Sequence, residues 1–315
     1  MATPLVAIVG PTASGKSALA LRLARERSGE IVSCDSLQVY RGLDIGSAKA
    51  TLAERAEVEH HLLDVADPGE GFSAADYARL ARAALDGVRA RGRLPIVAGG
   101  TGLYLRALVV GLFEGPPRDE TLRRRLEALG DRFGDERLHR LLGRVDPVAA
   151  ERIRPRDRVR VVRAIEVYRA TGRPISEQQR QGAEPLRGYL ALIVGLDPGR
   201  TALRAAIEAR TRQMLERGMI DEVRGLISRG LDPLARPLQA IGYRQARSVL
   251  RGEMTVEDAE RAIVTATLRF AKRQMTWFRH QAEVRWFAQA GEAHEAALAW
   301  LDVQPPGPPG PRPTP

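Results

Sequence analysis

The sequence has a single cysteine, Cys34, and no long apolar run. One thiol excludes an internal disulfide framework and a cysteine-rich zinc module, because each of these needs several cysteines. The best apolar stretches, residues 5–10 and 103–113, are too short or too interrupted for a membrane helix of about 20 residues. The first residues also lack the basic segment that begins a secretory signal peptide. We therefore expect a cytoplasmic protein with no membrane partner.

Lysine is scarce as well. The chain has 49 Lys and Arg residues against 39 Asp and Glu, a formal net charge of +10, but its only lysines are Lys16, Lys49 and Lys272. A basic excess of this size favours polyanionic partners such as nucleic acid, although compositional drift in an arginine-rich proteome would give the same excess. Where arginine fills nearly every basic position, the remaining lysines indicate places that need a compact, flexible ammonium group.

With 315 residues, the chain is long enough for two compact units or for one α/β domain that carries an insertion. Strand patterns alternate with helical patterns before residue 112 and after residue 187, which predicts an α/β fold with a parallel sheet covered by helices. The strands are expected at 5–10, 30–34, 94–98, 189–196 and 283–287. The helices of this part are expected at 17–27, 73–91, 201–217, 220–229, 243–250 and 255–280, with one more near Trp300.

Between about residues 113 and 186 the strand signal is lost. Helical patterns at 120–129, 136–142 and 157–171 follow one another there, separated by glycine and proline. The last residues are rich in proline and cannot pack a core. We therefore expect a core formed by residues 1–112 and 187–303, a helical insertion at 113–186 and a disordered tail at 304–315.

Residues 10–17 match the phosphate-loop pattern G-x-x-x-x-G-K-[ST] in full, between an expected strand and an expected helix. The loop consists of Gly10, Pro11, Thr12, Ala13, Ser14, Gly15, Lys16 and Ser17. Its backbone N–H groups and the start of the helix would stabilise an anion, Lys16 would reach the terminal phosphate, and Ser17 would hold Mg²⁺. A chance glycine-rich turn is the alternative. The pattern predicts a di- or triphosphate site, and does not by itself name a reaction.

Two further turns follow the next expected strands. Asp35 comes directly after one of them, and ligands of doubly wound sheets bind outside the carboxyl ends of the strands. Asp35 would thus help to bind Mg²⁺, accept a proton from a nucleophile or cap a turn, and these alternatives stay open. The turn at Gly99-Gly100-Thr101 precedes a second helix whose first N–H groups would suit an anion, with Thr101 as a hydroxyl donor. Tight packing of the strand against the helix also explains its glycines. We interpret Cys34 as a small buried residue rather than a nucleophile.

Several motifs in one order resemble those of the tRNA dimethylallyltransferase family, also called tRNA isopentenyltransferases. They are GPTASGKS at 10–17, DSLQVYRGLDIGSAK at 35–49, FSAADY at 72–77, GGTGLY at 99–104, VDP at 145–147, RAIEVY at 163–168, GYR at 242–244 and KRQMTWFR at 272–279. The resemblance covers nearly the whole chain except the proline-rich tail. Minor departures are Ser17 where threonine is common, and Ser47 and Ala50 where the family often has threonine and proline.

The resemblance implies a P-loop kinase-like core with a mainly helical insertion. It implies transfer of a dimethylallyl group from dimethylallyl diphosphate to N6 of the adenosine immediately 3′ of the anticodon in tRNA. The diphosphate and Mg²⁺ would occupy the phosphate loop. Asp35 would be the general base for the adenine amino group, and Thr101 and Arg210 would contact the reactive centre and the diphosphate.

The resemblance and the arginine-rich segments together predict contacts with the anticodon stem-loop of tRNA. The predicted positions are Asp35, Ser36, Leu37, Gln38, Thr101, Arg123, Arg158, Val159, Arg160, Val161, Val162, Gly242, Tyr243, Arg244, Lys272, Arg273, Trp277 and Arg279. On a helix beginning at Asp157, positions 156, 160 and 163 would share a basic face suited to a phosphate backbone. A solvated arginine face, and aromatic residues that belong to the core, are the alternatives.

Two other classes of function use the same motifs. A small-molecule kinase would bind ATP in the phosphate loop and use Asp35 as its base, but it would leave the basic insertion and the late basic helix without a role. A non-enzymatic RNA-binding protein with a degenerate nucleotide site is disfavoured by the intact Gly15-Lys16-Ser17. We expect a transferase that acts as a monomer.

Overall fold

The computed structural model describes residues 2–113, 115–181 and 184–304. The chain divides into two compact units, one formed by Met1–Val109 and Leu186–Pro315 and the other by Val110–Pro185. The expected tail at 304–315 lies outside the described residues except for Gln304. In the described part of the chain, no helix has the length and apolar character needed to cross a membrane.

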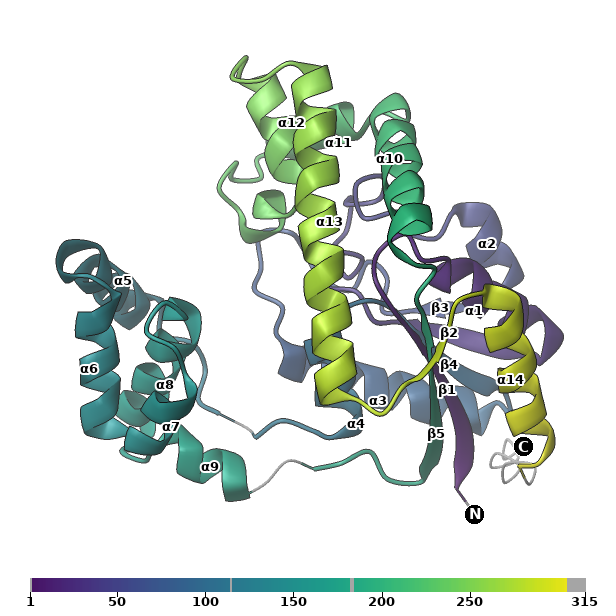
Figure 1. Ribbon diagram of the computed structural model, residues 1–315, viewed down its shortest axis with the longest axis horizontal. Helices are drawn as coiled ribbons and strands as arrows, with labels where there is room; N and C mark the ends of the chain where they lie inside the picture. Colours follow the sequence, from purple (N-terminus) through teal and green to yellow (C-terminus); the bar gives the residue numbers. More distant parts are fainter. Residues whose placement is uncertain (1, 114, 182–183, 305–315) are drawn as a thin grey trace. The chain divides into compact units, whose positions relative to one another are not determined.

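The first unit is built on one parallel sheet of six strands, with the order β3-β2-β4-β1-β5-β6 (Figure 1). The strands are β1 (Thr3–Val9), β2 (Gly29–Ser33), β3 (His60–His61), β4 (Leu94–Ala98), β5 (Tyr189–Leu196) and β6 (Arg285–Phe287). In β1, Leu5 belongs to the apolar cluster on one face of the sheet, and Val6 to the cluster on the other face. A strand buried on both faces needs a continuous apolar sequence, which explains the unbroken pattern seen there.

Helices surround this sheet, some on its two faces and others beyond the ends of its strands (Figure 1). They are α1 (Lys16–Glu26), α2 (Leu52–Glu57), α3 (Ala74–Ala90), α4 (Gly102–Val109), α10 (Arg200–Glu216), α11 (Met219–Ser228), α12 (Tyr243–Leu250), α13 (Val256–Gln281) and α14 (Ala290–Asp302), with a 3₁₀ turn at Arg236–Gln239. Leu23 of α1 and Ala297 of α14 pack on one face, where the two helices lie side by side in Figure 1. Tyr77 of α3 and Phe278 of α13 belong to the larger cluster on the opposite face.

The second unit is entirely helical in its described residues. It contains α5 (Glu120–Phe133), α6 (Asp135–Val145), α7 (Pro147–Arg152), α8 (Arg158–Thr171) and α9 (Ile175–Gln181) around a core that includes Leu138 and Val161. Buried Asp146 caps α7 by accepting the Ala149 N–H at 2.9 Å, and it also accepts the Ser176 hydroxyl at 2.6 Å. One carboxylate therefore fixes the start of α7 against α9.

The prediction of an α/β fold with a parallel sheet is confirmed, and the five expected strands are present within a few residues. The sequence reading missed β3, α2, α7 and α9, which have two, six, six and seven residues. Elements this short do not complete enough turns or alternations to give a periodic signal.

Candidate active site at the carboxyl ends of the strands

The phosphate loop joins β1 to α1 in a backbone conformation that requires glycine. Gly10 has φ 140°, and a Cβ atom placed on it would lie 2.6 Å from the carbonyl oxygen of Leu196 in β5. Gly15, at the N-cap of α1, has φ 90°, and no side chain caps the helix there. The first N–H groups of α1 are thus left for an anion, and the helix dipole adds to their attraction.

Lys16 is a strongly perturbed cation at the phosphate loop. Burial and, to a smaller extent, the positive charge of Arg210 together lower the pKa of its ammonium group from 10.5 to about 7, and the charge of Asp35 partly opposes them. The Nζ atom donates to the carbonyl oxygen of Pro11 at 2.5 Å, so the side chain folds back over its own loop. A cation held in this way is poorly solvated and gains most when an anion enters the site.

Arg210, on α10, is placed beside this lysine although it lies far away in the sequence. Burial lowers its pKa, and the charge of Asp35 raises it. The fold therefore gathers the predicted residues Lys16, Asp35 and Arg210 within electrostatic reach of one another. Two partly dehydrated cations and one carboxylate around an anion-binding loop are suited to stabilise a diphosphate.

Asp35 follows β2 and shapes the turn after it. Its Oδ1 accepts the N–H groups of Leu37 at 2.8 Å and Gln38 at 3.3 Å, which makes the turn-capping alternative real. Its Oδ2 has no hydrogen-bond partner among the residues that the structure describes, so one carboxylate oxygen is left for a ligand or a proton. The general-base role stays a prediction.

Thr101 connects the turns that follow β2 and β4. Its Oγ1 accepts the Ser36 N–H at 3.1 Å, and its own N–H donates to the Cys34 carbonyl oxygen at 3.1 Å. Because the hydroxyl oxygen accepts in this bond, its proton is left to donate elsewhere. Asp35 and Thr101 therefore belong to one cross-linked pair of turns.

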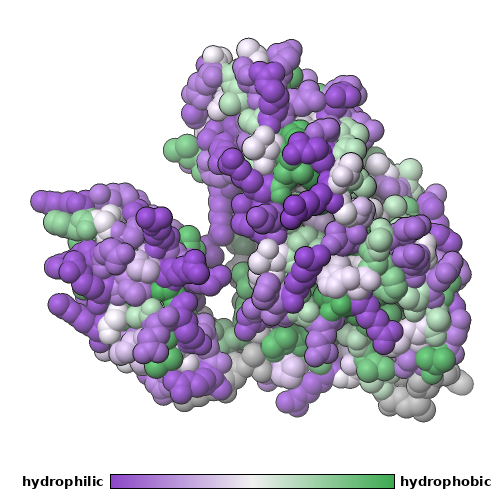
Figure 2. Space-filling model, viewed as in Figure 1, coloured by the Kyte–Doolittle hydropathy of each residue, from purple (hydrophilic) through white to green (hydrophobic). Residues whose placement is uncertain are grey.

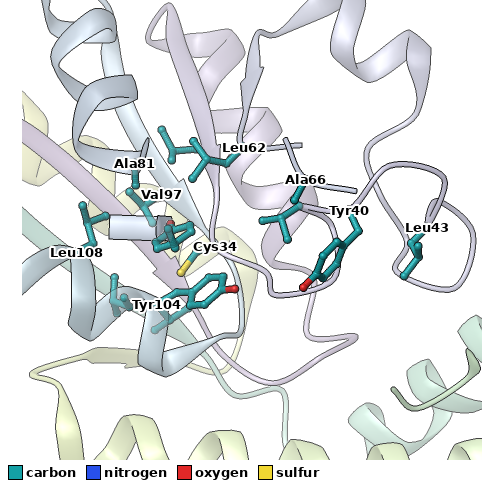
Figure 3. Close-up of a cluster of buried hydrophobic side chains, with 14 of the residues drawn as sticks. Cys34, Tyr40, Leu43, Leu62, Ala66, Ala81, Val97, Tyr104 and Leu108 are labelled. Atoms are coloured by element: carbon teal, nitrogen blue, oxygen red, sulfur yellow. The ribbon is translucent and has the colours of Figure 1, made fainter. Parts of the chain in front are cut away.

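Cys34 is buried in the main apolar cluster, where Figure 3 shows it beside Tyr104. Burial raises the pKa of its thiol to about 12. The ring of Tyr104 stacks on that of Tyr77 with centroids 4.3 Å apart. Burial in this cluster confirms the interpretation of Cys34 as a small buried residue, and a raised pKa disfavours the thiolate that a nucleophile needs.

The loop at residues 44–49 is held by two charged side chains, Glu222, which the sequence reading did not find, and Lys49, one of the three rare lysines. Glu222 of α11 accepts the N–H groups of Asp44, Ile45 and Gly46 at 2.9, 2.7 and 3.2 Å, and the hydroxyl of Tyr243 at 2.9 Å. The Lys49 ammonium, 1% exposed, donates to the Tyr40 carbonyl oxygen and to two aspartates. Three acceptors around one small cation explain why lysine rather than arginine occupies this position.

Several residues predicted to contact tRNA lie in the interior. The side chains of Val161 and Val162 are 0% and 2% exposed, and that of Tyr243 is 0% exposed. Gly242 is also buried, and Gln38 donates to the Ser47 and Ala48 carbonyl oxygens at 3.3 and 3.2 Å. The side chains of Val161, Val162 and Tyr243, at most 2% exposed, pack within the fold, and contact of these positions with tRNA stays a prediction.

Ion pairs occupy much of the predicted basic face of the second unit. Arg123 pairs with the buried carboxylate of Glu166 at 2.9 Å, and Arg163 pairs with the same carboxylate at 2.6 Å. Arg158 pairs with two aspartates, and Arg160 pairs with Asp157 at 3.3 Å. The expected face of positions 156, 160 and 163 is wrong in detail, because α8 begins at Arg158 and leaves position 156 outside it.

On α13 the predicted cations are exposed. Lys272 and Arg273 face solvent, and Arg279 pairs with Asp197 at 2.7 Å. The side of the first unit that carries α13 is mostly hydrophilic in Figure 2. Trp277 is half-buried against Gly102, at the start of α4. The exposed positions Ser36, Val159 and Arg244 also remain open as predicted contacts.

Gln274 is a residue that the sequence reading missed. It is buried on α13 in the stripe that also contains Ala271 and Phe278. Its side-chain amide hydrogen-bonds the phosphate loop and the turn after β4. The signal was present in the sequence, since a glutamine three and four residues from buried apolar positions on one helix face needs a polar partner inside the protein.

Comparisons with known proteins agree on one family. The family model described as IPP transferase matches residues 38–281. The tRNA dimethylallyltransferase of Solibacter usitatus is 49% identical over 299 residues, which cover 95% of this chain and 97% of that protein. The tRNA dimethylallyltransferase of Anaeromyxobacter dehalogenans is 50% identical over 302 residues, which cover 96% and 98%.

Solved structures show the same likeness. The full-length tRNA isopentenylpyrophosphate transferase of Bacillus halodurans is 40% identical, with a TM-score of 0.68 over 95% of this chain and 97% of that one. A eukaryotic dimethylallyltransferase acting on tRNA is 24% identical, with a TM-score of 0.76 over 98% of this chain and 82% of that one, and it supports the fold alone.

Proposed function

We propose a function from the premise that the chain belongs to the tRNA dimethylallyltransferase family. The chain is a prenyl transferase that acts on tRNA. We propose that it transfers the dimethylallyl group of dimethylallyl diphosphate to N6 of the adenosine 3′ of the anticodon. The gathering of Lys16, Arg210 and Asp35 at an intact phosphate loop is the observation that carries the chemistry. We also propose that the enzyme acts as a monomer in the cytoplasm.

The reaction breaks the bond between the allylic carbon and the diphosphate oxygen, and forms a bond from that carbon to N6. The electron pair of the broken bond goes to the diphosphate, so negative charge grows at the phosphate loop. The N–H groups at the start of α1, Lys16 and Arg210 stabilise this charge. Adenine N6 is a poor nucleophile that becomes acidic as the new bond forms, and Asp35 then takes its proton.

The residues present fit a magnesium ion that is shared with the donor. Ser17 is exposed in the first turn of α1, and Asp35 has a free carboxylate oxygen, which are the oxygen ligands that Mg²⁺ prefers. In the described residues, no group of three or more His, Cys, Asp or Glu side chains is placed to hold a metal ion. Mg²⁺ usually uses few protein ligands together with substrate phosphates. When bound, it would neutralise part of the charge on the leaving diphosphate.

One assay separates this function from the two alternatives. Undermodified tRNA is incubated with labelled dimethylallyl diphosphate and Mg²⁺, and a parallel reaction contains ATP instead. We expect label in tRNA with the wild type and a loss of nearly all label with Lys16→Ala, while tRNA affinity stays close to the wild-type value. Turnover of ATP with a small acceptor would favour a kinase, and binding of tRNA without transfer would favour a non-enzymatic RNA-binding protein.

A further inference from the structure

The side chain of Gln274 joins two turns at the carboxyl ends of β1 and β4. Its Oε1 accepts the Thr12 N–H of the phosphate loop at 2.9 Å, and its Nε2 donates to the Gly100 carbonyl oxygen at 2.9 Å. One amide thereby links Thr12 and Gly100, which lie 262 and 174 positions from Gln274 in the sequence. Gln274 is only 7% exposed, so these two bonds are made away from competing water.

The chain is built closely around this amide. A Cβ atom on Gly100 would collide with the Gln274 nitrogen, so a side chain at position 100 would displace the bridge. One turn further along α13, Trp277 lies against Gly102 in the same way. The helix that presents Lys272 and Arg273 to solvent is therefore packed directly on the turn that carries Thr101.

These two partners require a neutral side chain that accepts one hydrogen bond and donates another, as the amide of Gln274 does. The N–H of Thr12 needs an acceptor, and the carbonyl oxygen of Gly100 needs a donor, which fixes the orientation of the glutamine side chain. The bond to Thr12 also uses the N–H at the beginning of the loop, so the anion is left to the N–H groups nearer α1. The spacing between the phosphate loop and the turn after β4 follows from this bridge.

We propose that Gln274 is a positioning residue for the transfer reaction, which holds the phosphate loop and the Thr101 turn in the arrangement that binds the donor's diphosphate. This inference rests on the proposed function for the identity of the donor. It predicts that Gln274 affects diphosphate affinity without contacting the diphosphate. A purely structural role would lower stability and leave the affinity of the folded protein unchanged.

Two substitutions test whether the two hydrogen bonds of Gln274 set the affinity for diphosphate. Gln274→Met keeps the shape and loses both hydrogen bonds, and we expect about a 10-fold weaker affinity for magnesium pyrophosphate, the size of one lost buried interaction. Gln274→Glu places a carboxylate against the Gly100 carbonyl oxygen, which is repulsive when ionised. When protonated, the acid both accepts and donates, and so restores the bridge.

The experiment measures magnesium pyrophosphate affinity by calorimetry on the full chain without tRNA, between pH 5.5 and 8.5. Gln245→Met is the matched control, since Gln245 is a second buried glutamine that bonds the Gly242 N–H at 3.0 Å. Thermal unfolding is recorded for each variant. We expect the affinity of Gln274→Glu relative to Gln274→Met to rise at least about 5-fold as the pH falls, because protonation rebuilds both bonds.

Each outcome decides the inference. Wild-type affinity in the folded Gln274→Met variant, or parallel pH profiles for the Gln274→Met and Gln274→Glu variants, would overturn it. If Gln274→Met does not fold, the magnesium pyrophosphate affinity of Gln274→Glu is compared with that of the wild type over the same pH range. Parallel profiles of these two proteins would then overturn the inference. If the pyrophosphate affinity depends on Gln274 as expected but the wild type transfers no dimethylallyl group to tRNA, the proposed function is refuted and the role of the bridge stands.

Discussion

The buried ammonium of Lys16 should make the folded protein less stable at neutral pH than a variant that lacks it. Burial lowers its pKa from 10.5 to about 7, so the folded state resists protonation that the unfolded chain accepts freely. Between pH 7 and pH 10.5 the unfolded state binds more protons than the folded state. The free energy of unfolding therefore rises with pH in this window, by up to about 1.4 kcal/mol per pH unit.

The substitution Lys16→Met isolates this effect, because methionine has a similar shape and does not titrate. Titrating groups that do not interact with Lys16 contribute equally to both proteins and cancel in the difference. We expect Lys16→Met to be more stable than the wild type at pH 7, and this advantage to shrink by about 2 kcal/mol between pH 7 and pH 9. The same variant should lose nearly all transfer activity, since it lacks the cation that faces the diphosphate.

The assay is urea unfolding of both proteins at pH 6, 7, 8 and 9 in buffers free of phosphate. Magnesium pyrophosphate serves as a second condition, because a bound anion should return the Lys16 ammonium to its charged form and favour the wild type. Arg210→Gln removes a positive charge that helps to lower the pKa of Lys16. The folded-state pKa should then lie closer to 10.5, which narrows the pH range over which the free energy of unfolding depends on Lys16. Unfolding free energies of wild type and Lys16→Met that run parallel from pH 6 to 9 would refute the reasoning.

Three further predictions concern Asp35, Lys272 and the loop at residues 44–49. Asp35→Asn keeps the oxygen that caps its turn, so both substrates should still bind while the single-turnover rate falls about 100-fold or more; an almost unchanged rate would remove Asp35 from the base role. Lys272→Ala should weaken tRNA binding and reduce the slope of log affinity against log salt by about 0.7–0.9, as loss of one phosphate contact requires, with no change in the KM of the donor. Titrations at several salt concentrations test this, with Lys272→Arg as the charge-conserving comparison, and an unchanged slope would mean that the side chain is only solvated. Lys49→Met leaves Asp44 and Asp64 without their buried cation and should lower the free energy of unfolding by about 2–4 kcal/mol; a loss below about 0.5 kcal/mol in urea unfolding would contradict that placement.

The residues of the phosphate loop were evident from the sequence because their chemistry is local. A loop that binds an anion through backbone N–H groups needs glycines at fixed positions, and Gly10 and Gly15 lie at positive φ as the pattern demands. The continuous apolar run of β1 predicted a strand buried on both faces, and the 3.6-residue period of α3 predicted an amphipathic helix. Such signals depend only on neighbours within a few residues.

The pairings that hold the site together were decided by the path of the chain in three dimensions. Arg210 reaches Lys16 from α10, Glu222 binds N–H groups 176 to 178 positions away, and Gln274 bonds Thr12 across 262 residues. The position of a glutamine among apolar residues on one helix face indicates that it is buried, as at Gln274, but the sequence does not show which distant groups it bonds. The sequence by itself determined the fold class, the family and the phosphate loop. Only the tertiary structure showed that Tyr243 is buried and that Gln274 joins two turns, because burial depends on which elements pack together rather than on local residue order.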